Sequence, residues 1–141
     1  LDIQIIGPAD DVPYLRELKQ YCTDHGISEN VFVGSRAQSE LVSVYQQASI
    51  FFNTSTTHSM DKTVLESMLC GCIPVTGNNA FRDMLNEDGL YIENATANDY
   101  AKAITTLLSR KDLQDLRERL STEIIQQHSL TTITQRIFGI V

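Results

Sequence analysis

The stretch from position 58 to position 66 holds the side chains best suited to bind a ligand, namely His58, Lys62, Thr63 and Glu66. The lysine carries a positive charge that attracts phosphate, and the histidine exchanges hydrogen bonds with hydroxyl groups. The glutamate can accept hydrogen bonds from a diol such as that of a ribose. These residue types indicate a site that holds its ligand by charge and hydrogen bonding.

The elements expected around these residues form one βαβ unit. An apolar strand at 49–53 leads into a loop of small hydroxylated residues, a helix at about 61–70 and a second apolar strand at 73–76. Open parallel sheets bind ligands beyond the carboxyl ends of their strands, where this loop lies. The helix would also point its unpaired N–H groups and positive dipole end into the loop, a suitable seat for a diphosphate.

The same residues also have a purely structural interpretation. Thr63-x-x-Glu66 is a capping-box pattern, in which Thr63 caps the helix and Glu66 bonds back to it. Asp61 fits an ordinary N-cap. Asp61 would repel a diphosphate and Lys62 would attract one, so the site depends on which of these two side chains turns inward.

Strands and helices alternate along most of the chain. Apolar runs predict strands at 1–6, 31–33, 49–53, 73–76 and 89–92. Helical periodicity and capping residues predict helices at 11–25, 39–48, 61–70 and 81–85, then helices capped by Asn98 and Asp112 and a last helix at 131–141. The predicted fold is α/β: a Rossmann-like parallel sheet of about five strands with helices on both faces and a helical C-terminal tail.

Length and composition fit one globular domain, because 42% of the 141 residues are hydrophobic and 21% are charged. The net charge of −7 would repel a phosphate backbone and argues against nucleic-acid binding. No apolar run is long enough for a membrane span. Leu1 lies inside an apolar run and is not a methionine, so we expect the chain to be cut from a longer protein.

The three cysteines, Cys22, Cys70 and Cys72, form no C-x-x-C pair. Cys70 and Cys72 could be half of a metal site, but no further cysteine or nearby pair of histidines completes one. We therefore expect buried free thiols in a reducing cytoplasm and no bound metal.

Four segments carry a resemblance to a known family. Thr63–Val75 follows the pattern tvlEAmA-x-G-x-PV, Leu1–Gly7 and Val31–Gly34 are apolar strands that end in glycine, and His128-Ser129 lies where an f-S signature is expected. In this order they resemble the C-terminal, nucleotide-sugar-binding domain of the GT-B glycosyltransferases of family 4, also called group 1. The resemblance spans nearly the whole chain, and its specific part is the central run.

The resemblance implies a retaining glycosyltransferase, which moves a sugar from a nucleotide-diphosphate-sugar donor to an acceptor glycan, lipid or small molecule. It implies no cofactor and no protein-bound metal. The residues that match donor-binding positions are His58, Lys62, Thr63, Val64 and Glu66. The residues that match positions lining the nucleobase are Ser35 and Arg36.

The resemblance also implies how the chain relates to a complete enzyme. Residues 1–141 would be a single donor-binding domain that lacks its first strand and the N-terminal domain for the sugar or lipid-linked acceptor. The Arg and Lys that clamp the diphosphate in the family would precede Leu1, so no catalytic residue is assigned and the fragment alone would be inactive. The complete protein would be cytoplasmic, with peripheral attachment to a membrane through the missing domain as one option.

The chain departs from the family pattern in the loop. The family usually has two glutamates eight positions apart, the first of which faces the transferred sugar, and the partner of Glu66 is here His58. The loop also has Ser59–Lys62 where the family tends to have glycines. A second hypothesis is therefore a non-catalytic, glycosyltransferase-like module with a degenerate donor site.

Other Rossmann-like binders match less well. A dinucleotide-binding fold needs G-x-G-x-x-G after its first strand, and Gly7-Pro8-Ala9-Asp10 does not supply it. A phosphorelay receiver would need an acidic cluster at the strand ends and a lysine after a late strand, which Asp10-Asp11 and Lys62 do not convincingly match.

Overall fold

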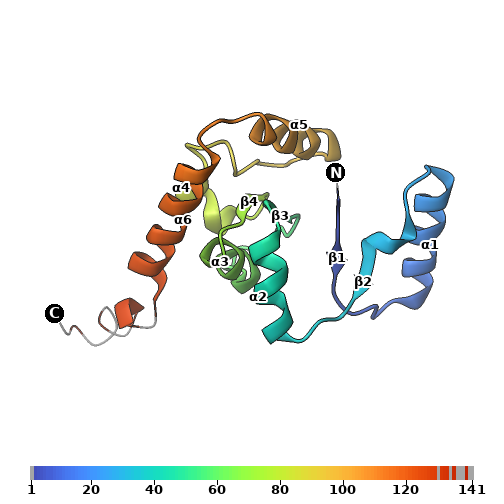
Figure 1. The fold of residues 1–141 in the computed structure, drawn as a ribbon, viewed down its shortest axis with the longest axis horizontal. Coiled ribbons are helices and arrows are strands. Elements are labelled where there is room, and N and C mark those ends of the chain that lie inside the picture. The colour runs from blue at the N-terminus through green and yellow to red at the C-terminus, as the bar shows by residue number, and fades with distance from the viewer. Residues whose placement is uncertain (1, 130, 134, 136–138, 140–141) are drawn as a thin grey trace. The chain divides into compact units, whose positions relative to one another are not determined.

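The structure is a computed structural model that describes residues 2–129, 131–133, 135 and 139. The chain divides into two compact units, Leu1–Leu41 and Val42–Val141, each considered by itself below. Figure 1 labels the helices and strands in chain order.

The first unit is a small parallel pair of strands with one helix. Its elements are β1 (Ile5–Ile6), α1 (Val12–Asp24), a 3-10 turn at Glu29–Val31, β2 (Phe32–Gly34) and the start of α2 (Gln38–Gln47). β1 and β2 pair in parallel, and the Gly7 N–H donates to the Gly34 carbonyl over 3.2 Å. α1 starts where expected because the Asp11 carboxylate accepts a hydrogen bond from the Tyr14 N–H over 2.9 Å.

The second unit holds the βαβ segment and the hydrophobic core. Its elements after α2 are β3 (Ile50–Asn53), α3 (Lys62–Leu69), β4 (Ile73–Thr76), a 3-10 turn at Asn79–Phe81, α4 (Arg82–Leu85), α5 (Ala97–Leu108) and α6 (Leu113–His128). β3 and β4 pair in parallel, with Ile50 opposite Ile73 and Asn53 opposite Thr76. The expectation of an α/β fold with parallel strands is confirmed.

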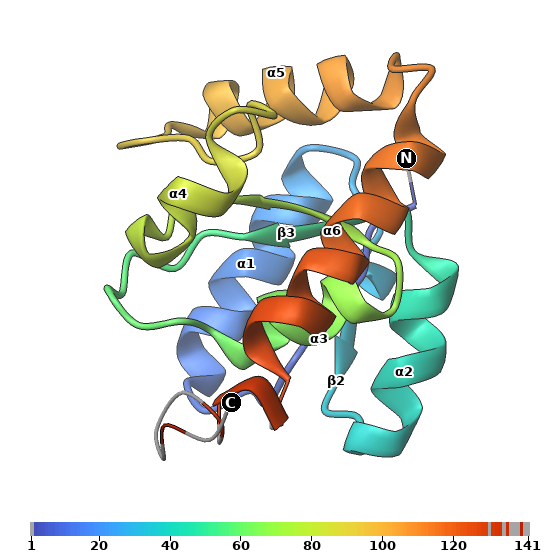
Figure 2. The same cartoon turned by 90° about the vertical axis from the view of Figure 1, so that its left-hand side faces the viewer.

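The core of this unit lies between β4 and the helices around it. All four residues of β4 are buried, and α3 packs against α6 (Figure 2). Three side chains are completely buried in the same cluster: Met68 of α3, Phe81 of the 3-10 turn and Leu120 of α6. An apolar residue on every turn of α3 and α6 faces this cluster, as amphipathic helices require.

The strand count is smaller than expected. Within the described residues four strands form two two-stranded parallel sheets, in place of one sheet of about five strands. The expected strand at 89–92 is reduced to a single parallel bridge between Thr76 and Tyr91. The physical reason is a turn at Glu93-Asn94, where Asn94 has a left-handed φ of 50°, which ends the pairing after one residue.

The starts of two helices also differ from expectation. α5 begins at Ala97 and not after Asn98, because Thr96 and Asp99 form a reciprocal capping box. α2 begins at Gln38, one residue before the cap expected at Ser39. Asp112 does precede α6, although its side chain makes no capping hydrogen bond. The expected helix at 131–141 lies largely outside the described residues.

All three cysteines are free, as expected, but Cys70 at the end of α3 is only partly buried, unlike the expectation. Cys72 is buried, its thiol donates to the Tyr45 carbonyl over 3.0 Å, and burial raises its pKa to about 11. Within the described residues, no group of three or more His, Cys, Asp or Glu side chains is placed to hold a metal ion. Among the same residues, no helix has the length and apolarity needed to cross a membrane.

The packing of α6 predicts that alanine substitutions at a buried and at an exposed position of this helix lower the free energy of unfolding by different amounts. Leu120→Ala removes a completely buried side chain and should lower the free energy of unfolding by about 2–5 kcal/mol. Ile125→Ala removes a side chain that is 57% exposed and should lower it by about 0.5 kcal/mol or less. Urea denaturation of both variants measures the difference, and equal losses would contradict the placement of α6.

Candidate functional site

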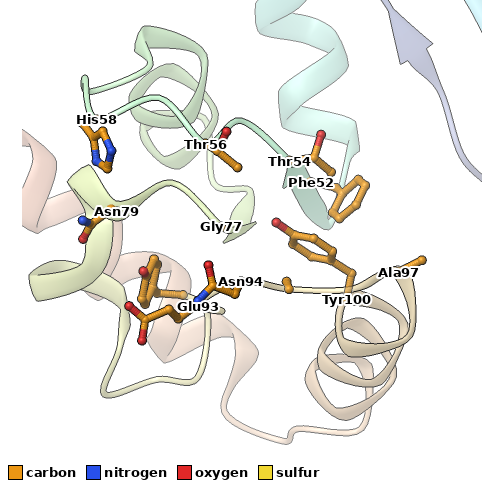
Figure 3. A pocket seen from close by; sticks show the side chains of 12 residues that line it. Phe52, Thr54, Thr56, His58, Gly77, Asn79, Glu93, Asn94, Ala97 and Tyr100 are labelled. Carbon is orange, nitrogen blue, oxygen red and sulfur yellow. The ribbon is translucent and has the colours of Figure 1, made fainter.

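A pocket of about 590 Å³ lies beyond the carboxyl ends of β3 and β4, entirely within the second unit (Figure 3). One wall comes from the loop after β3, which contributes Thr54, Thr56 and His58. Phe52 of β3, the turn after β4, and the segment from Tyr91 into the first turn of α5 supply the rest. The pocket therefore occupies the position where open parallel sheets bind ligands.

One side of the pocket is formed by Gly77 and Tyr100. The Gly77 N–H and the Tyr100 hydroxyl both donate to the Asn53 carbonyl, over 3.3 and 3.5 Å. A Cβ atom at position 77 would lie 2.5 Å from the Tyr100 hydroxyl oxygen, so only glycine fits beside this tyrosine. Burial raises the pKa of the Tyr100 hydroxyl above its usual value. Its ring packs edge-on against Phe52, with the ring centroids 4.7 Å apart.

The two ends of the pocket differ in character. In Figure 3, His58 and Asn79 lie toward one end, and Phe52 and Tyr100 toward the other. No lysine or arginine is among the described residues that line it. Glu93, its one acidic residue, is paired with Arg82. Hydroxyl, amide and imidazole groups beside aromatic rings suit an uncharged ligand that is rich in hydroxyl groups.

The loop that carries His58 is tied to the strands by a hydrogen-bonded network. The Asp61 carboxylate accepts from the amide groups of Asn53 and Asn78, over 3.3 and 3.1 Å, and from the Thr57 hydroxyl over 3.4 Å. The Thr76 hydroxyl donates to the Asn53 side-chain oxygen over 2.9 Å. The ends of β3 and β4 are thereby joined to the residue that precedes α3.

This network decides which side chain turns inward at the start of α3. Asp61 is the N-cap residue, as expected from the sequence, but its side chain makes no capping hydrogen bond. It points into the network, while Lys62 is exposed and forms no ion pair with a described residue. The first N–H groups of α3 consequently have no side-chain acceptor.

The capping box expected between Thr63 and Glu66 is not formed. α3 already begins at Lys62, so Thr63 lies inside its first turn and cannot be the N-cap. The Glu66 side chain is half-buried and makes no hydrogen bond with a described residue. Burial is the main cause that raises the pKa of Tyr45 and of Cys70, and the nearby charge of Glu66 raises both pKa values further. The carboxylate of Glu66 is therefore not committed to a cap.

The predicted donor-binding residues are not all gathered in one pocket. His58 lines the pocket, whereas Lys62 and Thr63 are exposed on the first turn of α3, outside it. Val64 is completely buried in the core, and its N–H donates to the Asp61 carbonyl over 3.1 Å. Glu66 also lies outside the pocket. The roles of these residues remain predictions.

The predicted nucleobase contacts lie in the first unit, in the turn between β2 and α2. Ser35 and Arg36 are both exposed, and Arg36 lies 4.0 Å from the Glu40 carboxylate on the next turn of the chain. Glu40 also accepts a hydrogen bond from the Ala37 N–H over 2.8 Å. An exposed ion pair of this kind contributes little to stability, so Arg36 is available to a ligand.

Sequence reasoning missed several residues that line or support the pocket. Tyr100 and Phe52 read as ordinary core residues of a helix and a strand, and Asn94 carried no signal because its left-handed backbone appears only in the structure. Gly77-Asn78 could have been found, because glycine and asparagine directly after a strand mark the backbone that approaches a ligand.

A family model described as "Glycosyl transferases group 1" matches residues 1–110. A similar curated protein is the alpha-monoglucosyldiacylglycerol synthase of Streptococcus pneumoniae, which is 32% identical over 84 residues. This alignment covers 59% of the chain but 19% of the relative, so the chain spans about a fifth of the relative's length. No solved structure gives a significant match. Because the family model covers most of the chain, the protein belongs to the group 1 glycosyl transferases.

Proposed function

We propose that this chain forms part of the donor-binding half of a retaining glycosyltransferase, which transfers a sugar from a nucleotide-diphosphate-sugar donor to an acceptor. The observation that carries the proposal is the pocket beyond β3 and β4, lined mainly by uncharged polar and aromatic side chains, with His58 at one end and aromatic rings at the other. Hydroxyl groups of a hexose can exchange hydrogen bonds with threonine, asparagine and histidine side chains. The pocket thus suits the transferred sugar.

The diphosphate would bind next to the pocket, at the start of α3. The first N–H groups of this helix lack a side-chain cap, Lys62 is exposed beside them, and Asp61 is drawn away into its network. These features attract an anion by charge and by the helix dipole. Glu66, whose carboxylate is free of capping bonds, would accept hydrogen bonds from the ribose. The nucleobase role of Ser35 and Arg36 in the first unit stays a prediction from the family resemblance. Catalysis would rest on positioning and on stabilising the leaving diphosphate, without a metal or a cofactor.

The edge of β3 supports the proposal that a preceding strand completes the domain. The Ser49 and Asn53 carbonyls accept from Ile73 and Gly77, so alternate residues of β3 direct their backbone groups toward β4. No described strand pairs with the opposite edge. In a doubly wound sheet the first strand lies at the centre of the sheet, with neighbours on both edges. A strand from outside the second unit would fill this place, and in the complete protein an N-terminal domain would bind the acceptor.

The curated relative suggests which substrates to examine first. Its name describes a product in which one glucosyl group is joined to diacylglycerol. We propose that glucose is the first sugar to test and that the acceptor is a lipid, with a glycan or a small molecule as the other options. A lipid acceptor would bring the protein to the cytoplasmic face of a membrane.

One observation favours a second candidate function, a non-catalytic module. The residue in the pocket that would face the sugar is His58, where the group usually has a glutamate. If this substitution has abolished donor chemistry, the domain would serve assembly or regulation. The two candidates differ in whether the protein binds a nucleotide sugar at all.

The first prediction concerns Glu66 and donor binding. In the complete polypeptide that contains this chain, calorimetric titration with uridine, guanosine and adenosine diphosphate glucose should show binding of the donor that carries one of these three nucleotides. Glu66→Ala should weaken that binding by about tenfold, because the ribose loses its acceptor. Glu87→Ala, which changes an exposed glutamate without a partner among the described residues, should leave it unchanged. Absence of binding by the folded wild-type protein would favour the non-catalytic module.

The second prediction concerns His58 and the sugar. His58→Ala should lower kcat/KM for transfer by about tenfold or more while leaving the affinity for the free nucleoside diphosphate unchanged, because the lost contact is to the sugar alone. His58→Gln keeps a hydrogen-bonding side chain and should retain more activity than the alanine variant. Steady-state kinetics with the preferred donor measures both. Equal loss of sugar and nucleotide affinity would place His58 elsewhere in the site.

A further inference from the structure

Asn78 follows β4 by two residues and is completely buried. Its side-chain amide donates to the Ser59 carbonyl over 2.9 Å, to the Asp61 carboxylate over 3.1 Å and to the Thr57 hydroxyl over 3.4 Å. Its side-chain oxygen accepts from the Ala80 N–H over 3.0 Å. One amide from the turn after β4 therefore binds three residues near the end of the loop after β3.

These contacts surround the residue that faces the pocket. Thr57 and Ser59 are the two chain neighbours of His58, and Asn78 contacts both. His58 itself is exposed and makes no hydrogen bond with a described residue. The backbone position of His58, from which its imidazole extends, is consequently set by its neighbours.

Asn78 also connects the two walls of the pocket. The loop wall presents His58, and the opposite wall presents Gly77 and Asn79, the chain neighbours of Asn78. A second link runs from the Asn78 N–H to the Thr76 hydroxyl over 3.0 Å, and from that hydroxyl to Asn53. A buried network in which each member is satisfied rigidifies the backbone that it joins. The width of the pocket at the His58 end therefore depends on Asn78.

We propose that Asn78 is a positioning residue, which holds the loop 54–61 so that His58 faces the sugar of the donor. The inference rests on the proposed function for its consequence in catalysis, and on the hydrogen bonds alone for its effect on the loop. An amide is required at this position because it donates to Asp61 and to Ser59 while its oxygen accepts from Ala80. A carboxylate there would face Asp61 with no hydrogen to donate.

The first measurement reads the loop without any ligand. In the complete polypeptide, Asn78→Ala should increase amide hydrogen exchange in peptides covering 54–61 by about tenfold, while α6 exchanges as in the wild type. Asn98→Ala is the matched control, since Asn98 is exposed and its side chain makes no hydrogen bond with a described residue. Unchanged exchange in the loop would overturn the proposal.

The second measurement reads the sugar site. Asn78→Ala should weaken binding of the preferred nucleoside diphosphate glucose by about tenfold and leave the matching nucleoside diphosphate unaffected, because only the sugar reaches His58. Equal weakening of both ligands would mean that Asn78 serves general stability and would overturn the positioning role. If the wild-type protein binds none of these donors, the proposed function fails, and hydrogen exchange alone decides whether Asn78 fixes the loop.

Exchanging the side chains at positions 78 and 61 distinguishes the loss of one hydrogen bond from general misfolding. Asn78→Asp should loosen the loop, since two carboxylates then face each other. Adding Asp61→Asn restores one amide-to-carboxylate hydrogen bond between the same positions, so the double variant should recover part of the lost protection and of the lost sugar affinity. A double variant no better than Asn78→Asp would contradict the direct coupling of the two residues.

Discussion

The site depends on the parallel pairing of β3 with β4, which places Asn53 opposite Thr76 where both strands end. The Thr76 hydroxyl donates to Asn53, and the amide of Asn53 donates to Asp61 at the start of α3. Without this register the loop, the helix start and the turn after β4 would not meet. Each polar group in the chain of hydrogen bonds has a partner, which removes the cost of burying it.

The network also affects how the Asp61 carboxylate would act on a diphosphate bound at the start of α3, as proposed above. A carboxylate next to the N-terminus of α3 would ordinarily cap that helix and repel an approaching diphosphate. Here the Asp61 charge is held by amide and hydroxyl donors on its other side, and the exposed Lys62 is the charged side chain nearest in sequence to the helix start. On a chain with a net charge of −7, local arrangement of this kind is required to hold a phosphorylated ligand.

Membership of the family does not by itself establish activity, and the residue that raises this question is His58. The family is shown by a match over residues 1–110, whereas the proposed sugar contact rests on a single side chain in the pocket. A neutral imidazole can both donate hydrogen bonds to sugar hydroxyls and accept them, whereas an ionised glutamate can only accept them. Its exposed position among threonine and asparagine residues is compatible with a sugar contact and with a site that has lost its donor. Fold alone does not decide between these functions.

The sequence by itself determined the α/β class, the βαβ unit and the strand β4 at Ile73–Thr76, because apolar periodicity and the glycine at 71 act over a few neighbouring residues. It also determined that His58 lies in the loop that follows the strand β3. The fifth strand was wrong, since pairing beyond Tyr91 is stopped by the backbone turn at Asn94. Only the tertiary structure decided that Asp61 turns into a network, that no capping box forms at Glu66, and that Asn78 and Tyr100 shape the pocket. The physical reason is that the contacts of Asn78 with Asp61 and of Tyr100 with Asn53 join residues 17 and 47 positions apart, and hydrogen bonds across such separations follow from packing, which local patterns do not encode.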